Sequence, residues 1–421
     1  MHREFKITKN EKDYLRELAA RQLEYANLPV MEEREKLWYA HNRLEGERPV
    51  IVMEYQTFES EILPQPRCVS PAAAEIEKTL LGQLVNHELI NDDKVVPPYY
   101  AINWDIAIKE FDMDIETSHA VDGNGRNIGY VWQHPIHDLK EDFHLLKHSV
   151  YKSDKEGTMA WKSFIEETLG DILPVVVKNN SLAWNAVITS KVIRLMGLEK
   201  MMYSMMDYPD EMHALNSFLV DDILAFARWQ QEEGLLVLNN GNDYTGAGSY
   251  GFTTELPGED YIENGQVSLK DLWLNINSQE SVGISPEMYG EFIYPYYKRL
   301  AEEYGLVYYG CCEPVQGIWE EYLSKLPNLR KVSISPWCDE EFMGRALKNS
   351  PVIYSRKPSP NYIGVGSFEE DNFTKYMAKT LEAAKGGHLE IIFRDVYTLD
   401  GDKSKPGKAV KIVRGLIEKM W

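Results

Sequence analysis

The sequence predicts one (β/α)8 TIM barrel of the α/β class, and two observations lead to that prediction. Short apolar runs of strand length alternate with amphipathic segments of helical length along most of the chain, and no Pro/Gly/Ser-rich linker divides it. Strands that are buried on both faces of a parallel sheet read as continuous apolar runs, and their alternation with helices predicts βαβ units. Eight such units match a closed barrel. An open doubly wound sheet with a helical appendage is the alternative.

The expected strands can be placed in chain order by their apolar residues. They are 49–54, 174–178, 235–238, 272–276, 306–309, 330–334, 352–355 and 389–393. Ser285-Pro286 opens the helix after the fourth strand, with a capping residue and a proline in the first turn. The helices expected between and after the later strands are 318–326, 340–347, 372–385 and 408–420.

The domain organisation follows from where this alternation begins. Residues 1–48 are expected to form an N-terminal helical extension, because 9–45 is charged and helical in character. The barrel then occupies 49–421, with a long insertion at about 55–170 after the first strand. This insertion is rich in aromatic and turn residues, and Asp122-Gly-Asn-Gly125 predicts a hairpin tip within it.

Composition restricts the classes of partner. A net charge of −21 argues against nucleic acids and anionic membranes. No stretch approaches the roughly 20 apolar residues that span a bilayer, and the N-terminus lacks the apolar core of a signal peptide. The four cysteines are too few for a disulfide framework, so we expect a cytoplasmic protein. A homodimer is left open.

The most informative segment is 306–314, Leu-Val-Tyr-Tyr-Gly-Cys-Cys-Glu-Pro, in which a buried strand runs directly into two thiols and a carboxylate. Active sites of TIM barrels lie at this end of the strands. Adjacent cysteines rarely bond to each other, because the ring that they close is strained. Cys311 and Cys312 are therefore expected to offer a thiolate to a metal or to a reactive carbon, although packing at the barrel rim is the simpler alternative.

The other strand ends also carry polar residues, which together predict a polar ring at one mouth of the barrel. From these ends we expect Glu280, Asp339 and Asp395 to be catalytic. The expected substrate-binding residues are Glu54, Lys178, Asn240, Trp337, Arg356 and Arg394. Several of them also have a plain structural explanation. Asp339 suits the first turn of a helix, and Arg394 can simply pair with Asp395.

Three segments, 309–314, 326–337 and 355–358, resemble the uroporphyrinogen decarboxylase superfamily, and specifically its branch grouped with cobalamin-dependent methyltransferases. Residues 246–257 and 390–395 fit the same branch. The resemblance covers roughly 170–421 and is looser before that. It implies a (β/α)8 barrel, which agrees with the independent strand count.

Departures from the family narrow the expected reaction. The segment 52–57 lacks the arginine that clamps propionates in the decarboxylases, so porphyrinogen decarboxylation is not expected. Thiol-activating methyltransferases of the branch hold zinc through a His-x-Cys pair, and here Tyr309-Gly-Cys311 stands in that place. Arg394-Asp395 replaces their second cysteine. A modified zinc site with Cys311, Cys312, Glu313 and Asp395 as ligands is the resulting expectation, with Cys338 and Glu280 as further candidates.

The resemblance implies a methyltransferase-like enzyme that moves a methyl group between a small substrate and a corrinoid. The expected substrate is a methyl ether, a thiol or an amine. The chain shows no corrinoid-binding module, so a separate corrinoid protein is expected to present the cofactor, with zinc activating the substrate. The alternatives are a decarboxylase of a small acid and a non-catalytic barrel that binds a ligand or a corrinoid protein.

Overall fold

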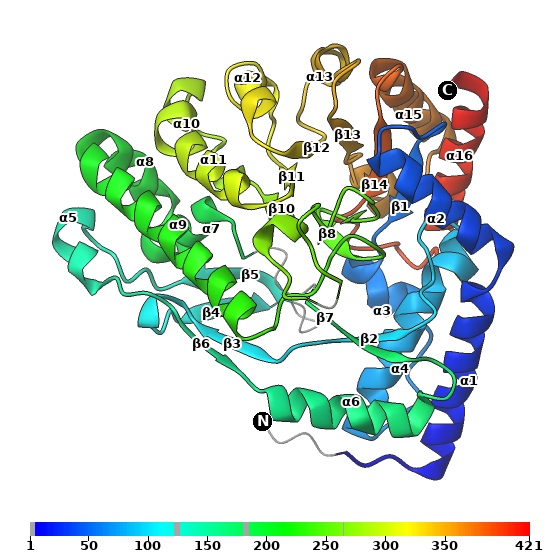
Figure 1. The fold of residues 1–421 in the computed structure, drawn as a ribbon. Helices are drawn as coiled ribbons and strands as arrows, with labels where there is room; N and C mark the ends of the chain where they lie inside the picture. Colours follow the sequence, from blue (N-terminus) through cyan, green and yellow to red (C-terminus); the bar gives the residue numbers. More distant parts are fainter. Residues whose placement is uncertain (1–4, 122–126, 180–184, 264) are drawn as a thin grey trace.

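The computed structural model describes residues 5–121, 127–179, 185–263 and 265–421, and its centre is a six-stranded parallel sheet (Figure 1). At one edge of this sheet, the first strand of the chain pairs with the last. In spatial order the strands are β1 (Val50–Met53), β14 (Leu389–Phe393), β13 (Ile353–Arg356), β12 (Leu329–Ile334), β11 (Leu306–Tyr309) and β10 (Trp273–Ile276).

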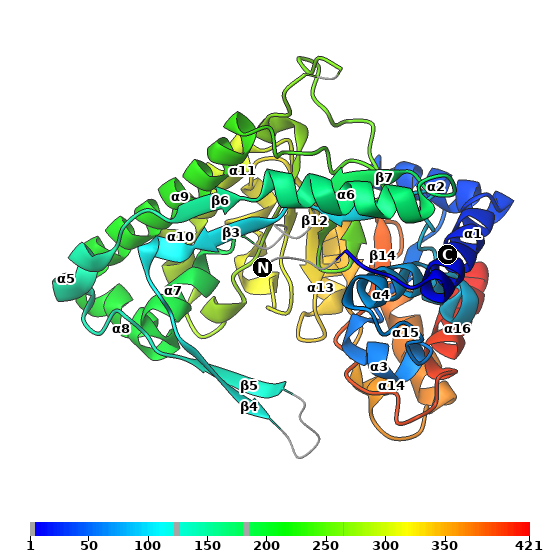
Figure 2. The same ribbon diagram turned by 90° about the horizontal axis from the view of Figure 1, so that it is seen from below.

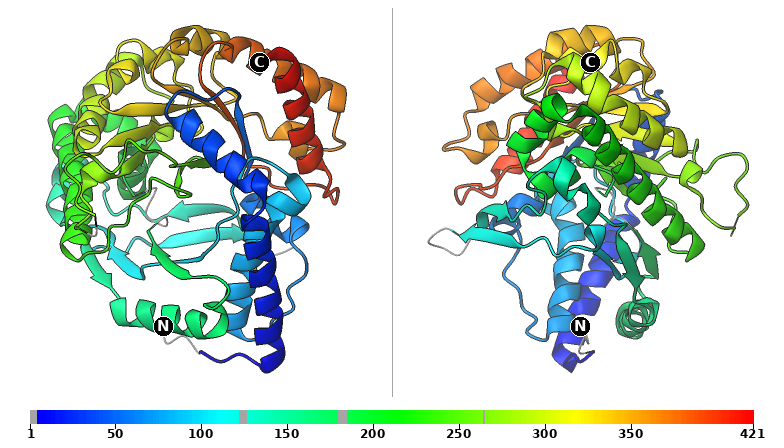
Figure 3. Two further views of the ribbon diagram at one scale, coloured as in Figure 1. Left: turned by 45° about the vertical axis from the view of Figure 1, so that its right-hand side comes forward. Right: turned by 90° about the vertical axis from the view of Figure 1, so that its left-hand side faces the viewer.

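Two further strands, β2 (Tyr100–Asn103) and β7 (Val175–Lys178), form a separate parallel pair. This pair and the six-stranded sheet face a common interior (Figure 3). Hydrogen bonds between the described strands do not join the two sheets into one ring. The arrangement is therefore TIM-like, and the closed eight-stranded barrel expected from the sequence is not shown.

The expected strand at 235–238 is wrong. This segment has no regular secondary structure and belongs to no sheet. The preceding helix ends at Glu232, and the Leu235 amide donates to the carbonyl of Gln230 in its last turn. The Asn239 side chain then bonds the backbone of Trp273 at both its N–H (2.9 Å) and its carbonyl (3.1 Å). A side chain thus occupies the edge of β10 where a neighbouring strand was expected.

The N-terminal segment contains α1 (Lys9–Ala26) and α2 (Pro29–Asn42). Between β1 and β7, where the sequence predicted a long insertion, the chain forms several helices and strands. It forms α3 (Glu59–Ile62), α4 (Pro71–Val85), β3 (Ile106–Lys109), β4 (Thr117–Val121), β5 (Asn127–Trp132), α5 (Leu139–Asp142), β6 (Val150–Ser153) and α6 (Lys155–Leu169). The antiparallel pair β4–β5 extends away from the body (Figure 2). Its predicted tip at Asp122–Gly125 lies outside the described residues.

The helices that follow β10 in the chain lie along the outer side of the six-stranded sheet, and the helices between β7 and β10 lie beyond its β10 edge (Figure 1). A short antiparallel pair, β8 (Tyr244–Gly246) and β9 (Ser249–Tyr250), lies on the opposite side. The helices are α7 (Ile188–Met196), α8 (Leu198–Asp207), α9 (Pro209–Glu232), α10 (Pro286–Phe292), α11 (Tyr294–Glu303), α12 (Gln316–Trp319), α13 (Glu340–Leu347), α14 (Asn361–Gly364), α15 (Glu370–Ala384) and α16 (Lys405–Met420). None of the helices in the described ranges is long and apolar enough to cross a bilayer.

Side chains alternate across the sheet, and the two faces differ in character. The outward side chains, such as Ile276, Val332 and Ile391, pack against the helices in the main apolar core. The inward side chains of β12 and β14 include Lys331 and Glu390, and neither is exposed to solvent. The interior therefore carries buried charges.

Glu390 is the centre of this interior. One of its carboxylate oxygens lies 3.2 Å from the Lys331 ammonium and 3.2 Å from the His41 ring, and it accepts a hydrogen bond of 2.9 Å from Ser249. The other oxygen accepts a hydrogen bond from Ser355. Burial opposes ionisation, but Lys331 and His41 hold the pKa of Glu390 well below its ordinary value.

Removing Glu390 is predicted to destabilise the protein strongly. Glu390→Ala leaves Lys331 buried without its counter-ion, a change that costs about 3–5 kcal/mol. The free energy of unfolding from urea titration measures this. Glu390→Gln/Lys331→Met removes both charges and is expected to recover part of the loss. Asp221→Ala, which breaks an exposed ion pair, serves as the control and should change stability by less than about 1 kcal/mol. A loss of similar size in Glu390→Ala and the control would contradict the prediction.

Candidate active site

Three strand ends bring charged side chains together at the carboxyl edge of the sheet. Glu54 directly follows β1, and Arg394 and Asp395 follow β14, the strand paired with it. The guanidinium Nε of Arg394 lies 3.3 Å from a Glu54 oxygen and 3.3 Å from an Asp395 oxygen. All three were expected from the sequence to lie at this mouth, and the structure brings them into one cluster.

The backbone of Asp395 is in the left-handed region, with φ of 58°. A residue with a side chain adopts this conformation rarely, although Asp is among the residues that tolerate it. Such conformations are held in place by surrounding contacts and recur at functional sites. Here the Arg394 contact fixes the Asp395 carboxylate beside the charged cluster.

The two adjacent cysteines lie at the end of β11, after a turn at Gly310 with φ of 100°. Their sulfur atoms are 3.5 Å apart, and Cys311 is buried whereas Cys312 is exposed. A hydrogen bond between the two sulfurs lowers the pKa of Cys312, and Arg394 lowers it further. The same hydrogen bond, together with burial, raises the pKa of Cys311. Of the pair, Cys312 therefore ionises first.

Glu313 has a different part in the site from the one expected. Its buried carboxylate accepts backbone hydrogen bonds from Ser278 (2.9 Å) and Cys311 (3.0 Å). Burial raises the pKa of this carboxyl group. Glu313 thus ties the loop after β10 to the loop after β11 and holds the cysteines in position.

The ligand set expected for zinc can be compared with these contacts. In the described part of the chain, no group of three or more His, Cys, Asp or Glu side chains is arranged to hold a metal ion. Glu313 bonds to backbone N–H groups, and the Cys338 thiol contacts Ser335 and the Glu313 carbonyl. The arrangement does not fit a preformed zinc site, and zinc stays a prediction from the sequence.

Lys357 is a residue that the sequence analysis did not select. Its ammonium donates to the Tyr308 hydroxyl (2.6 Å) and to the Ser355 hydroxyl (2.6 Å), and the latter also donates to Glu390. Burial lowers the pKa of Lys357 to about 7, with Glu390 opposing the shift and Arg394 adding to it. Lys357 follows β13 on the inward side of the sheet.

Arg356, which the sequence analysis chose instead, is not brought to the cluster. It is fully buried, and its guanidinium bonds the Ser335 carbonyl (2.7 Å), the Tyr376 hydroxyl (2.7 Å) and the Glu340 carboxylate (2.5 Å). Consecutive residues of a strand point to opposite faces. Ser355 points inward, so Lys357, two residues later, lies on the same side of the sheet. This alternation would have selected Lys357 from the sequence.

Tyr244 is a second residue that sequence reasoning missed. Its hydroxyl lies close enough to Glu54 to affect the pKa of that carboxyl group, and it accepts a hydrogen bond from the Gly248 amide at 3.2 Å. A Cβ at Gly248 would lie 2.3 Å from Ile392 and 3.1 Å from the Glu54 carboxyl carbon, so the β8–β9 turn passes close over Glu54. Burial is the main reason why the pKa of Glu54 is raised. Glu54 therefore keeps a proton more readily than an ordinary glutamate.

The other predicted residues make contacts elsewhere. Lys178 pairs with Asp243 at 2.8 Å, and the Asn240 amide donates to the Leu256 carbonyl at 2.6 Å. Glu280 accepts from Thr189 at 2.6 Å.

Two more predicted residues lie around the start of α13. Asp339 caps this helix by accepting from the Phe342 amide, and Trp337 is 73% exposed. Their roles in substrate binding or catalysis stay predictions.

Comparison with known proteins gives further evidence on the type of fold. No family model and no curated protein sequence matches the chain. Among solved structures, the chain is similar to a methyltransferase from Methanosarcina mazei, with a TM-score of 0.50 and 13% sequence identity. The match covers 92% of this chain and 98% of that one. At this identity the likeness shows a methyltransferase-like fold alone.

Cys312 is predicted to be the cysteine that iodoacetamide modifies first, because the thiolate is the nucleophile. In Cys311→Ala the hydrogen bond that lowers the pKa of Cys312 is lost, so the alkylation rate should rise at a higher pH than in the wild type. Mass spectrometry of peptides taken along a pH series measures both effects. Cys338→Ala removes a buried thiol and is the control. Faster labelling of Cys311, or an unchanged pH profile in Cys311→Ala, would refute the assignment.

Lys357 is predicted to make stability depend on pH above neutrality. Its folded-state pKa of about 7 lies below its ordinary value of 10.5, so the unfolded chain binds more protons between these limits. Wild-type stability should therefore rise with pH in this window relative to Lys357→Met, by at most about 1.4 kcal/mol per pH unit. Urea titrations at several pH values measure the difference. Replacing the exposed Lys325 by Met should give no such difference, and equal slopes in wild type and Lys357→Met would show that Lys357 titrates normally.

Proposed function

We propose that this protein is a methyltransferase-like enzyme that moves a methyl group between a small substrate and a corrinoid carried by a separate protein. The observation that carries the proposal is the cluster of Glu54, Arg394, Asp395 and the Cys311–Cys312 pair at the carboxyl edge of the sheet. Active sites of TIM-like folds lie at this edge. The methyltransferase-like fold supports the type of reaction, and so does the resemblance of 309–314, 326–337 and 355–358 to the corrinoid branch of the uroporphyrinogen decarboxylase superfamily.

The cluster offers a proton for the atom that loses its methyl group. When a methyl ether, thioether or amine is demethylated, the electrons of the broken carbon–heteroatom bond stay on the heteroatom, which then takes up a proton. Glu54 has a raised pKa and is positioned by its ion pair with Arg394, so it suits the role of general acid. A corrinoid presented at the mouth by its own protein would supply the nucleophile.

The cysteine pair and Arg394 suit the binding of the substrate. Cys312 is exposed, and its pKa is lowered whereas that of Cys311 is raised, so the more readily ionised thiol of the pair faces the mouth near Arg394. A reducing cytoplasm, in which all four cysteines stay free as the structure has them, is the compartment that this chemistry requires. Zinc, where it is bound, would act as a Lewis acid on the substrate. No step proposed for Glu54 depends on it.

Decarboxylation of a small acid is the second candidate. Arg394 lies close enough to Lys357 to lower its pKa. Two cationic side chains near one another favour binding of a carboxylate. A non-catalytic binding protein is the third candidate. Such a protein would carry out neither methyl transfer nor decarboxylation.

The proposal predicts methyl transfer that depends on Glu54. We expect the wild-type protein to transfer methyl groups from at least one of anisole, dimethyl sulfide and methylamine to cob(I)alamin under anoxic conditions. The change in corrinoid absorbance measures the rate. Glu54→Gln removes the proton donor while keeping the shape, and it should lower kcat by about 10²–10⁴. The exposed Glu45→Gln is the matched control and should leave the rate unchanged.

Three results would count against this assignment. Carbon dioxide release from small acids without methyl transfer would favour the decarboxylase. No turnover in either assay would favour the binding protein. Full activity of Glu54→Gln would remove Glu54 from the mechanism even if methyl transfer occurs.

A further inference from the structure

The thiols of Cys311 and Cys312 lie side by side at the end of β11. Their sulfur atoms are 3.5 Å apart, and both cysteines are free. Cys312 is exposed, and Cys311 keeps 7% of its surface accessible. A reagent that bonds to the exposed sulfur of Cys312 therefore arrives next to a second sulfur atom.

The backbone that carries the pair is fixed on both sides of Cys311. The Cys311 N–H donates to the Glu313 carboxylate at 3.0 Å, and its carbonyl accepts from the Ser333 hydroxyl at 2.8 Å. One residue earlier, the Gly310 N–H donates to the Ile276 carbonyl at 2.8 Å. The two thiols are therefore held near one another before a ligand arrives, which lowers the entropic cost of binding to both.

The other two cysteines offer a different environment. The thiol of Cys338 is buried and contacts the Ser335 hydroxyl and the Glu313 carbonyl. Cys68 is buried in a separate apolar cluster formed largely by α1, α4 and α6. Each is a single buried thiol, so both serve as internal comparisons for the exposed pair.

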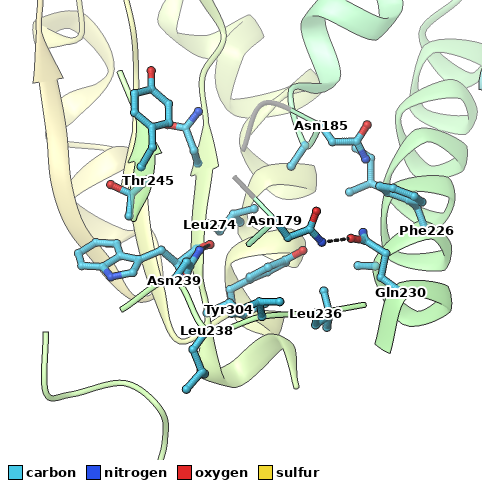
Figure 4. Close-up of a pocket in the computed structure, with 18 residues that line it drawn as sticks. Asn179, Asn185, Phe226, Gln230, Leu236, Leu238, Asn239, Thr245, Leu274 and Tyr304 are labelled. Atoms are coloured by element: carbon cyan, nitrogen blue, oxygen red, sulfur yellow. Dashed lines mark hydrogen bonds between the residues drawn. The ribbon is translucent and has the colours of Figure 1, made fainter. Parts of the chain in front are cut away.

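A pocket between β10 and α9 is a separate feature (Figure 4). Its described lining residues include neither Cys311 nor Cys312. A ligand that is held by the two thiols therefore lies at the rim after β11 and not in this pocket.

The geometry of the pair restricts the kind of ligand that both sulfur atoms can bind. Thiolates are soft ligands and select soft acceptors. A two-coordinate Cu(I) or Hg(II) ion holds its two sulfur atoms on opposite sides, so it needs them farther apart than 3.5 Å. Trivalent arsenic is pyramidal and holds its bonded atoms on one side, which suits two sulfur atoms that are already in contact.

The number of ligating groups leads to the same class of compound. In the described part of the chain, no group of three His, Cys, Asp or Glu side chains is arranged to hold a metal ion. An organoarsenical brings its own third bonded atom, because one position on arsenic is taken by carbon. Two thiols then complete its coordination.

We infer that Cys311 and Cys312 form a binding site for trivalent organoarsenicals, in which arsenic carries one carbon group and two hydroxyl groups. Each thiol gives its proton to one hydroxyl group, which leaves as water, and an S–As bond replaces the As–O bond. Arsenic stays trivalent, so no oxidant or reductant takes part. The inference does not rest on the proposed methyl transfer, because binding alone tests it.

Phenylarsine oxide, which is hydrated in water, is a suitable probe. We expect native mass spectrometry to find one phenylarsenic group per wild-type chain. Because both S–As bonds must be broken for release, the adduct should withstand β-mercaptoethanol at a concentration about 10²–10⁴ times higher than an adduct on one thiol does. Cys311→Ala and Cys312→Ala each leave one thiol of the pair and should lose this resistance. Cys338→Ala is the matched control and should keep it.

A second measurement uses the wild type alone, so that the test does not depend on the folding of a variant. After excess reagent is removed, bound phenylarsine oxide should protect Cys312 from iodoacetamide, and release by dithiothreitol should restore its labelling. No resistant adduct on the wild type, unchanged resistance in either Cys311→Ala or Cys312→Ala, or an unprotected Cys312 would overturn the inference. Loss of the adduct in Cys338→Ala would overturn it as well.

Discussion

The buried carboxylate of Glu390 connects more parts of this protein than any other interaction described above. It meets Lys331 from β12, Ser355 from β13, Ser249 from the β8–β9 pair and His41 from the N-terminal helix α2. Each of these polar groups would be costly to bury alone. Because all of them pair through one carboxylate, the sheet, the hairpin and the N-terminal helix must come together for any of them to be satisfied. The interaction thus specifies the arrangement more than it adds net stability.

A single side chain, that of Ser355, connects the Glu390 carboxylate to the mouth. Ser355 donates to Glu390 and accepts from Lys357, which lies at the end of β13. Glu390 raises the pKa of Lys357, while burial and Arg394 lower it to about 7. The interior network therefore influences the charge at the mouth, where Glu54, Arg394 and the cysteine pair gather. Stability and the chemistry of the site depend on a shared set of residues.

The sequence predicted the six-stranded sheet well because its strands are local apolar runs. It missed β2, since Tyr100–Asn103 is short, follows two prolines and becomes a strand only by pairing with β7. It also overestimated 235–238, where an asparagine side chain takes the position of a strand.

For the site, residues that directly follow a strand, such as Glu54 and Arg394, could be placed from the sequence. Tyr244 could not, because it reaches Glu54 from a hairpin whose position depends on the whole fold. Arg356 was selected for its charge, and the alternation of side chains along β13 would have selected Lys357 instead.

The most direct test of this account is the pKa of Lys357, measured by NMR on protein with 13C-labelled lysine, in the wild type and in Glu390→Gln/Lys331→Met. The double variant removes the central charges as a pair, so the fold keeps no unpaired ion there. The account predicts a Lys357 pKa near 7 in the wild type and a lower one in the double variant, because Glu390 no longer stabilises the ammonium form. An ordinary lysine pKa in the wild type, or the same pKa in both proteins, would contradict the link between the interior and the mouth.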